Sequence, residues 1–492
     1  DRMATASQRP LSSRIAGRGA LLFSGFALAQ MLSFVRNALL AHLLSKGDFG
    51  VAAAILLLLQ TIETLSDLGA DRLIVQDRDG DDARFVANAH TALVVRGIVT
   101  AVIIAALALP IARLFAIEHA AWAFATIALS PAIKGFLHLD SRRVQRHLDN
   151  RPQMLIEVAP QVLALALAWP IVQWLGGYAA VVALALTQSV IAVAVSHIMA
   201  ERPYAIAVDR AHMSRLMSFG WPIWASAFPL VAVYHGDRIL IGHLAGIESL
   251  AAYTVAFMVT MVPGLVAAKV ANALMLPLLA DARDEPARFT ASLLLMIEAT
   301  VLVSAIYLAL FVIAGDPVVT FAFGAAYSGL GSVVALLALM WSMRMLQATM
   351  GVALMAVGET RPFLAAGLIR AIGLPLAGAA LLLGYGLAGA AAAGALAEFL
   401  SLVYVAWCMQ GRLPQRSELG TATLKRATFI AVAGIAALMS EIALKPVGLG
   451  SSLAVATAAS VATIFTAAMF MPAIRNAIVD RLASRDAALP SG

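Results

Sequence analysis

The sequence is poor in charged residues. Asp, Glu, Lys and Arg together make up 13% of its 492 residues, whereas 61% are hydrophobic. A soluble domain carries about 25% charged residues, so this chain lacks the side chains that would cover a water-soluble surface. Because a helix needs about 20 mostly apolar residues to cross the hydrocarbon core of a bilayer, the composition indicates an all-helical protein with many membrane spans.

Cysteine is almost absent as well. The one cysteine, Cys408, lies in an apolar run and excludes a disulfide within the chain. We expect it to be a small apolar side chain in a helix. The sequence also contains no GxxxxGK[ST] phosphate-binding loop, which argues against a P-loop ATPase. We expect no cofactor and no bound metal.

Long outer loops are missing too. The longest connection on the predicted outer side, 314–329, has Asp316 as its one charged residue, and no catalytic constellation is visible. A membrane-embedded enzyme, such as a sugar polymerase or ligase, would need a sizeable outer loop for its chemistry. This alternative is therefore weak, and we expect that the protein is not an enzyme.

Apolar runs, separated by charged residues or by Gly and Pro, make up most of the chain. They predict about fourteen membrane-spanning helices. The expected spans are 19–44, 50–76, 86–112, 118–139, 153–174, 178–199, 217–243, 250–279, 289–313, 330–356, 362–383, 386–409, 427–444 and 451–473. The first run contains Ala27-Leu28-Ala29, which resembles a signal-peptide cleavage site. Because the run continues to Leu44, we expect a permanent first helix.

The basic residues follow the loops in an alternating pattern. Loops on the side of the N-terminus, such as 141–152 and 200–216, hold most of the arginines, whereas the opposite side holds only Lys46, Arg113 and Lys445. Cytoplasmic loops of membrane proteins carry the excess of Lys and Arg, so both termini are predicted to be cytoplasmic. The net charge of +6 is thereby explained without a nucleic-acid partner.

Two stretches about two hundred residues apart are similar, which suggests an internal repeat. They read RNALLAHLLSKGDFGVAAA from Arg36 and RILIGHLAGIESLAAYTVA from Arg238, and His42 aligns with His243. A parallel repeat predicts two lobes of about six helices each, with the substrate path between them. The expected divisions are a cytoplasmic tail 1–18, an N-lobe 19–199, a linker 200–216, a C-lobe 217–409, a cytoplasmic loop 410–426, a helix pair 427–473 and a cytoplasmic tail 474–492.

Specific strings carry a family resemblance. HLLSKGDFGVAAA and LSDLGADRLIVQ in the first lobe, and GDRILIGHLAGIESLAAYTVA in the second, resemble the polysaccharide-transporter family, which includes the flippases for O-antigen and exopolysaccharide units. That family belongs to the superfamily of multidrug, oligosaccharidyl-lipid and polysaccharide flippases. The resemblance extends over nearly the whole chain and implies an alternating-access flippase for a lipid-linked oligosaccharide.

Cationic side chains inside the spans are the main candidates for a substrate-binding site. A charge at mid-membrane costs about 2.5–3.5 kcal/mol on insertion scales, so such a cation faces a cavity, a counter-charge or an interface. Within the expected spans these cations are Arg36, Arg96, Lys134, Arg238, Lys269, Arg344 and Arg370. Arg96 and Lys134 lie near the cytoplasmic end, where long side chains snorkel. The other five, with Arg238 nearest the outer end, are predicted to line a cationic cavity.

Such a cavity would suit the substrate that the resemblance implies. A polyprenyl pyrophosphate carries about two negative charges, and guanidinium and ammonium groups pair strongly with phosphate oxygens. Glu298 and Glu398, the buried acidic candidates, are expected to be partners of Arg344 or Arg370. A negative-inside membrane potential favours outward movement of an anion.

Acidic residues recur every fourth position in the second expected span. Glu63, Asp67 and Asp71 would form one stripe on a continuous helix. They either neutralise Arg36 and Arg72 as structural pairs, or provide, through Glu63 and Asp67, a site for proton or ion coupling.

These observations lead to one functional expectation. The protein is predicted to be a multi-pass flippase of the bacterial inner membrane that moves polyprenyl-pyrophosphate-linked oligosaccharide to the periplasmic leaflet for lipopolysaccharide or exopolysaccharide biosynthesis. Two alternatives stay open: a multidrug or metabolite cation antiporter of the same superfamily, and a flippase for the peptidoglycan precursor. Membrane lipids are expected partners, and the family resemblance implies polysaccharide polymerase and export proteins as others.

Overall fold

The computed structural model describes residues 11–147, 149–282, 284–359, 361–412, 428–440, 448–471 and 473. All regular secondary structure in these ranges is helical. Twelve helical stretches among the described residues are long and apolar enough to cross a membrane, when the two consecutive helices of Arg361–Leu382 are counted as one. The predicted class, an all-helical membrane protein with many spans, is confirmed.

The chain forms two compact units. Unit 1 consists of residues 1–235 with 246–251, and unit 2 consists of residues 236–245 with 252–492. The expected boundaries of lobes, linker and tails describe the order of membrane spans and loops, whereas these units describe spatial compactness. The expected boundaries therefore stay predictions. Each unit is described by itself below.

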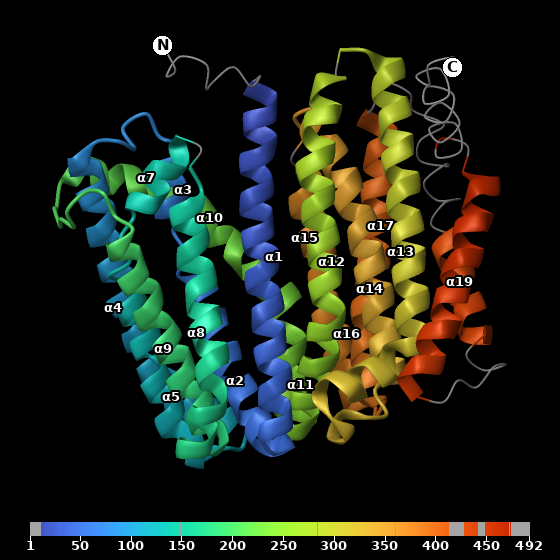
Figure 1. The fold of residues 1–492 in the computed structure, drawn as a ribbon, viewed down its shortest axis with the longest axis horizontal. Coiled ribbons are helices and arrows are strands. Elements are labelled where there is room, and N and C mark those ends of the chain that lie inside the picture. The colour runs from blue at the N-terminus through green and yellow to red at the C-terminus, as the bar shows by residue number, and fades with distance from the viewer. Residues whose placement is uncertain are drawn as a thin grey trace, which may run out of the picture. The chain divides into compact units, whose positions relative to one another are not determined.

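Unit 1 is a bundle in which α8 contacts both α1 and α9, as Figure 1 shows. Its helices are α1 (Leu11–Leu43), α2 (Lys46–Leu65), α3 (Ala70–Gln76), α4 (Ala83–Leu114), η1 (Glu118–Ala120), α5 (Ala121–Ile127), α6 (Leu129–Lys134), α7 (Asp140–Arg146), α8 (Arg151–Leu175), α9 (Gly177–Ile198) and α10 (Arg210–Tyr234). Side chains cap three of the helix starts, since Ser45, Asp82 and Asp209 accept backbone N–H groups of the first turn. Such caps satisfy N–H groups that have no partner within the helix.

The second expected span, 50–76, is wrong as a single helix. Helix α2 ends at Leu65, and Gly69 has a φ of 62° before α3 begins. Glycine adopts this left-handed conformation without steric penalty. The Asp67 carboxylate accepts the Gly69 N–H at 3.0 Å and closes the turn. Asp67 and Asp71 therefore lie beyond the helix that carries Glu63, and the three residues do not form a continuous helical stripe.

Two other expected spans account for the difference between about fourteen predicted helices and the twelve found. The span 118–139 is divided into η1, α5 and α6, and the break falls before Pro131, which has no N–H to donate to the preceding turn. In the span 427–444, the described residues Thr428–Ser440 form a shorter apolar helix.

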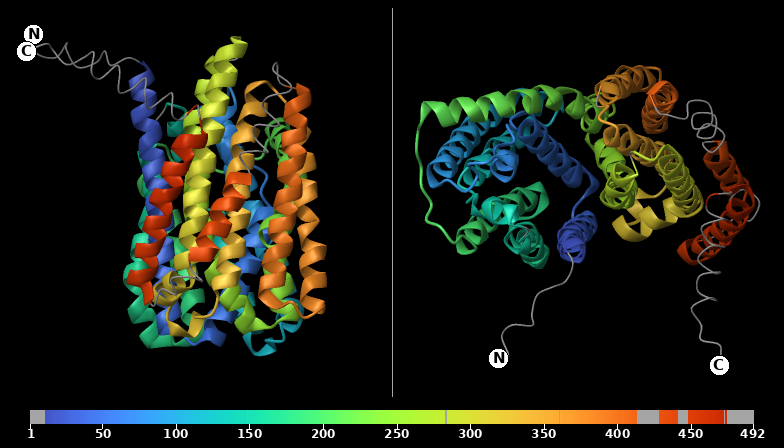
Figure 2. Two further views of the ribbon diagram at one scale, coloured as in Figure 1. Left: turned by 90° about the vertical axis from the view of Figure 1, so that its right-hand side faces the viewer. Right: turned by 90° about the horizontal axis from the view of Figure 1, so that it is seen from above.

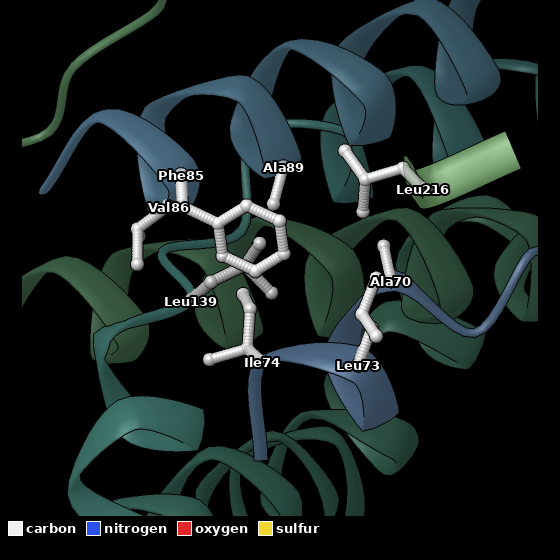
Figure 3. Close-up of a cluster of buried hydrophobic side chains, with 8 residues drawn as sticks. All are labelled: Ala70, Leu73, Ile74, Phe85, Val86, Ala89, Leu139 and Leu216. Carbon is white, nitrogen blue, oxygen red and sulfur yellow. The ribbon is translucent and has the colours of Figure 1, made fainter. Parts of the chain in front are cut away.

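A cluster of buried hydrophobic side chains fixes α3 in unit 1. Figure 3 shows these side chains pointing toward one another from α3, α4, α10 and the segment before α7. The members are Ala70, Leu73, Ile74, Phe85, Val86, Ala89, Leu139 and Leu216. Phe85 and Ile74 are fully buried, and full burial of such side chains stabilises by about 1.5–3 kcal/mol each. This packing sets the position of Asp71 and Arg72, which belong to the same short helix.

The segment before α10, residues 201–209, has no regular secondary structure and lies against α4. The Asp209 N–H donates to Asn88 Oδ1 at 2.6 Å, and the Thr91 hydroxyl donates to the Ala207 carbonyl at 2.7 Å. His90 Nδ1 lies 3.0 Å from the Ala205 carbonyl. Polar side chains of α4 thus replace the backbone partners that a helix or strand would have provided.

Unit 2 is arranged around α13 and α14. Its helices are α11 (Gly236–Leu244), α12 (Ile247–Asp281), α13 (Pro286–Phe323), η2 (Ala325–Tyr327), α14 (Gly331–Ala356), α15 (Arg361–Ala371), α16 (Gly373–Leu382), α17 (Gly386–Arg412) and α19 (Gly448–Phe470). The start of α12, up to Ala251, belongs to unit 1. Helix α14 contacts α13 and α17, and α13 also contacts α19, which is drawn in red beside it in Figure 2.

The two similar sequence stretches have the same local structure. His42 lies in the last turn of α1, and α2 begins at Lys46 after a break. His243 lies in the last turn of α11, and α12 begins at Ile247 after Gly246, whose φ is 89°. The predicted repeat therefore corresponds to two helix–turn–helix segments, whereas the wider six-helix repeat stays a prediction.

Candidate substrate-binding and ion-coupling sites

A polar cavity of about 560 Å³ lies in unit 1. It is bounded by α2, α3, the turn between them, α4, α8, α10 and the segment from Leu137 to Arg142. The polar residues that line it are Gln60, Glu63, Thr64, Asp67, Asp71, Arg72, Arg96, His138, Ser141, Arg142, Gln153 and Ser226. Although the acidic residues do not share one helix, the turn at Gly69 brings all three to the wall of this cavity.

Each acidic residue of the polar cavity has a cationic partner. Glu63 Oε1 lies 3.0 Å from Lys134 Nζ, and the Asp67 carboxylate lies 3.2 Å from Arg72 and 3.4 Å from Arg96. Asp71 pairs with Arg142 at 3.2 Å. The expected pairing of the acidic residues with Arg72 is confirmed for Asp67.

Arg96 and Lys134 were expected to snorkel toward the interface, but both turn toward α2. The Arg96 guanidinium donates to Ser66 Oγ at 3.3 Å and to the Glu63 carbonyl at 3.1 Å, in addition to its contact with Asp67. The carbonyls at the end of a helix lack partners within the helix. The Arg96 guanidinium therefore donates to one of these carbonyls and also pairs with the Asp67 carboxylate. The two side chains thus have partners at the end of α2, and their position relative to the membrane interface stays a prediction.

Arg36 has a different environment. Its guanidinium donates to Gln161 Oε1 at 2.8 Å and to Ser33 Oγ at 3.2 Å, and the same Gln161 oxygen accepts from Gln188 at 3.0 Å. The expected pairing of Arg36 with the acidic residues of the second span is wrong, because its bonds in the described part of the chain are to neutral groups. An arginine held by a neutral amide and a hydroxyl has no counter-charge from these partners and can pair with an anionic ligand.

In unit 2, Arg344 of α14 forms an ion pair with Glu398 of α17. Both side chains are buried, and Arg344 donates from Nε at 2.7 Å and from Nη2 to the same carboxylate oxygen. The guanidinium also lies over the Trp341 ring, 4.7 Å from its centroid. The prediction that Glu398 is a partner of Arg344 or Arg370 is confirmed for Arg344. Glu298 is buried on α13.

The remaining candidate cations lie in unit 2 as well. The Arg238 guanidinium lies over the Phe257 ring, 4.7 Å from its centroid. The half-buried Arg370 donates from Nε to the Ala366 carbonyl at 3.4 Å. Lys269 belongs to α12, but its side chain lies outside the described residues. The structure therefore places Arg238, Arg344 and Arg370 in one unit and Arg36 in the other, and a common cavity for the five cations stays a prediction.

Several polar residues of these sites were not found by sequence reasoning. Asp237 accepts the hydroxyl of the buried Tyr253 at 2.8 Å. The Gln161 amide oxygen accepts from both Arg36 and Gln188, although neither glutamine carries a charge. The signal that could have found them is the same for each, namely a polar side chain in the middle of an apolar run, which requires a partner when buried.

Three solved structures identify the fold. A lipid II flippase, MurJ, in an inward closed conformation is 12% identical with a TM-score of 0.71, and the match covers 93% of this chain and 99% of that chain. An inward-facing multidrug resistance MATE family transporter of the MOP superfamily is 16% identical with a TM-score of 0.59, covering 84% and 94% of the two chains. A eukaryotic MATE transporter is 12% identical with a TM-score of 0.57, covering 84% and 98%. The protein is thus a multi-pass membrane protein with the fold shared by these flippases and transporters.

The sequence identifies the family. Residues 39–331, more than half of the chain, match the family described as polysaccharide biosynthesis protein. The protein belongs to that family, as the strings in the two stretches predicted. No curated protein sequence matches the chain.

Proposed function

We propose that the protein is a flippase that moves a polyprenyl-pyrophosphate-linked oligosaccharide from the cytoplasmic to the periplasmic leaflet of a bacterial inner membrane. It acts by alternating access, with both termini in the cytoplasm, and it carries its substrate without chemical change. The product supplies surface polysaccharide biosynthesis. Polymerase and export proteins are proposed as partners that take over the translocated unit.

Membership of the polysaccharide biosynthesis family, together with the environment of Arg36, carries this proposal. Arg36 lies within a helix long and apolar enough to span the membrane, and among the described residues its guanidinium donates to the neutral side chains of Gln161 and Ser33. A cation within a span is costly unless a cavity or an anion compensates it. A pyrophosphate would provide that compensation through charge-assisted hydrogen bonds.

Arg238, Lys269, Arg344 and Arg370 complete the proposed cationic cavity. Of these, Arg344 already has a carboxylate partner in Glu398, so it would meet the substrate by changing partners. Outward movement of the anion gains about 2.3 kcal/mol per charge for each 100 mV of negative-inside potential. Transport therefore needs no ATP in this proposal.

Glu63 and Asp67 are the proposed coupling residues. Both carboxylates are partly exposed in the polar cavity, and each is paired with cations that could be released when a proton or another cation binds. A coupling role predicts that Glu63→Gln alters the dependence of transport on a pH gradient. A purely structural role predicts an effect on stability alone.

The test is translocation in proteoliposomes that contain purified protein and one of three substrates. These are a polyprenyl-pyrophosphate oligosaccharide, a lipid-linked peptidoglycan precursor and a cationic drug. We expect the oligosaccharide to move far above the rate in empty liposomes. Preference for the peptidoglycan precursor would replace the proposed substrate by that precursor. Movement of the drug alone, abolished in Glu63→Gln, would replace the flippase by a cation antiporter.

A further inference from the structure

A second hollow of unit 1 borders the polar cavity. It has a volume of about 710 Å³ and is lined mainly by apolar side chains of α2, α4 and α10, among them Leu65, Val95, Val99 and Phe228. We refer to it as the apolar pocket. Arg96 lines both the apolar pocket and the polar cavity. The Arg96 guanidinium therefore lies at the junction of the polar cavity and the apolar pocket.

The apolar pocket is built for hydrocarbon. Val99 is 51% exposed, and Trp224 and Phe228 of α10 are 41% and 50% exposed, although all three are large and apolar. Water against such a lining has few polar partners, so hydrocarbon is the better occupant of this hollow.

The charges at the junction leave an excess of positive charge. The ion-pair network at the junction contains four cations and three carboxylates, namely Arg72, Arg96, Lys134 and Arg142 with Glu63, Asp67 and Asp71. All of them line the polar cavity except Lys134, which pairs with Glu63 from outside its lining. Lys134 and Arg142 each have their own carboxylate, whereas Arg72 and Arg96 share Asp67. The uncompensated positive charge of the network is thus shared by Arg72, in the polar cavity, and Arg96, which also lines the apolar pocket.

We propose that the polar cavity and the apolar pocket form one loading site for the lipid-linked saccharide. The sugars occupy the polar cavity, the pyrophosphate lies against Arg96 and Arg72, and the first prenyl units fill the apolar pocket. The proposal rests on the proposed function, from which it takes the class of ligand. It adds a site in unit 1 that does not include the five residues of the predicted cationic cavity.

The polar lining favours a saccharide over an ordinary phospholipid headgroup. Gln60, Thr64 and Gln153 offer amide and hydroxyl groups beside the carboxylates, and sugar hydroxyls can both donate to and accept from such groups. A cavity of about 560 Å³ lies within the range of small-molecule sites. The site also lies toward the end of α2 that the charge pattern predicts to be cytoplasmic, where the proposed substrate would enter.

Site-specific photo-cross-linking tests the proposal. A benzophenone side chain is placed at Val99 in the apolar pocket or at Val102, which is 62% exposed on the same helix and does not line the pocket. The probe is a radiolabelled polyprenyl pyrophosphate bearing a disaccharide, in lipid nanodiscs with full-length protein. We expect labelling from Val99 to exceed labelling from Val102. Arg96→Gln should lower the labelling from Val99 at least about tenfold, which corresponds to about 1.4 kcal/mol.

The free polyprenol, which has the same chain without pyrophosphate or sugar, serves as the second probe. It should label the two positions alike. Equal labelling of Val99 by polyprenol and by the full probe would overturn the proposal and assign the apolar pocket to nonspecific hydrocarbon. Equal labelling of Val99 and Val102 by the full probe would overturn it too.

A filling variant provides a readout that does not depend on the cross-linker. Ala92→Phe adds a ring to the wall of the apolar pocket, and Val102→Phe adds the same ring outside it. We expect Ala92→Phe to raise the KM for translocation while Val102→Phe leaves it unchanged. An unchanged KM in a folded Ala92→Phe protein that translocates normally would reject the loading site and leave the proposed function standing. Failure of the proposed function itself would appear as absence of translocation in the wild-type protein.

Discussion

The charged residues of the two units differ in how they are held. In unit 1, Glu63 and Asp67 line a cavity, and their side chains are 26% and 27% exposed. In unit 2, Glu398 is 2% exposed and is bonded by the single guanidinium of Arg344. Exposed pairs contribute little to stability and exchange partners readily, whereas a buried pair that loses one partner leaves an uncompensated charge. The comparison indicates that the ion pairs of unit 1 exchange partners at little cost, whereas Arg344 and Glu398 hold α14 to α17 until another anion takes the place of the carboxylate.

The largest expected effect comes from breaking the buried pair. Arg344→Ala leaves the Glu398 carboxylate buried without its cation, and we expect a loss of about 3–5 kcal/mol of unfolding free energy. The double variant Arg344→Met with Glu398→Leu should recover most of that loss, because both charges are removed together. Thermal unfolding in detergent compares the three proteins. An Arg344→Ala protein as stable as the wild type would show that the pair is not structural.

A smaller effect is expected at Asp140, which lies outside the spans of unit 1. Burial opposes ionisation, but the hydrogen bond from Arg143 Nε at 2.6 Å and the Glu201 N–H at 2.8 Å hold the pKa of Asp140 below its ordinary value. Since the folded-state pKa is lowered, the ionised group stabilises the fold above about pH 4, and this contribution is lost as the pH falls further. Asp140→Asn should cost about 1–3 kcal/mol at neutral pH and flatten the acid limb of the stability profile. An acid limb identical to that of the wild type would contradict this assignment.

The smallest effect on stability is expected at the exposed pairs of the polar cavity. Lys134 is 38% exposed and lies 3.0 Å from Glu63, so Lys134→Met should change the unfolding free energy by no more than about 1 kcal/mol. Glu63→Gln should have a similarly small effect. The matched control is Arg113→Ala, which removes a cation paired at 3.9 Å with Glu118 at an exposed site. If Lys134→Met destabilised as strongly as Arg344→Ala, the distinction between the two units would fail.

The sequence predicted the class of fold and part of the charge arrangement. Spans such as 330–356 follow from apolar runs alone, and the described helix α14 has nearly the same bounds. The partner of Arg344 was predictable as well, because a buried arginine requires a counter-charge and few acidic residues lie in apolar runs. Hydropathy therefore locates both the helices and the charges that must pair inside them.

Other contacts depend on backbone breaks or neutral partners, which hydropathy does not reveal. The turn at Gly69 interrupts a stretch that is apolar on both sides, so Asp67 and Asp71 could not be placed correctly. Arg36 bonds to Gln161, a residue 125 positions away, and an amide leaves no charge pattern to follow. The partners of Arg96 depend on the packing of α4 against the end of α2, which only the fold determines.

The measurement that tests the central claim most directly is translocation of polyprenyl-pyrophosphate oligosaccharide by wild-type protein, Arg36→Ala and Lys269→Ala, with Arg113→Ala as the control. All four are compared in proteoliposomes under a negative-inside potential, after equal folding has been established. The account predicts rapid movement in the wild type and the control, and its collapse in Arg36→Ala and Lys269→Ala. Undiminished movement in Arg36→Ala would contradict the cationic cavity, and no movement in the wild type would contradict the flippase itself.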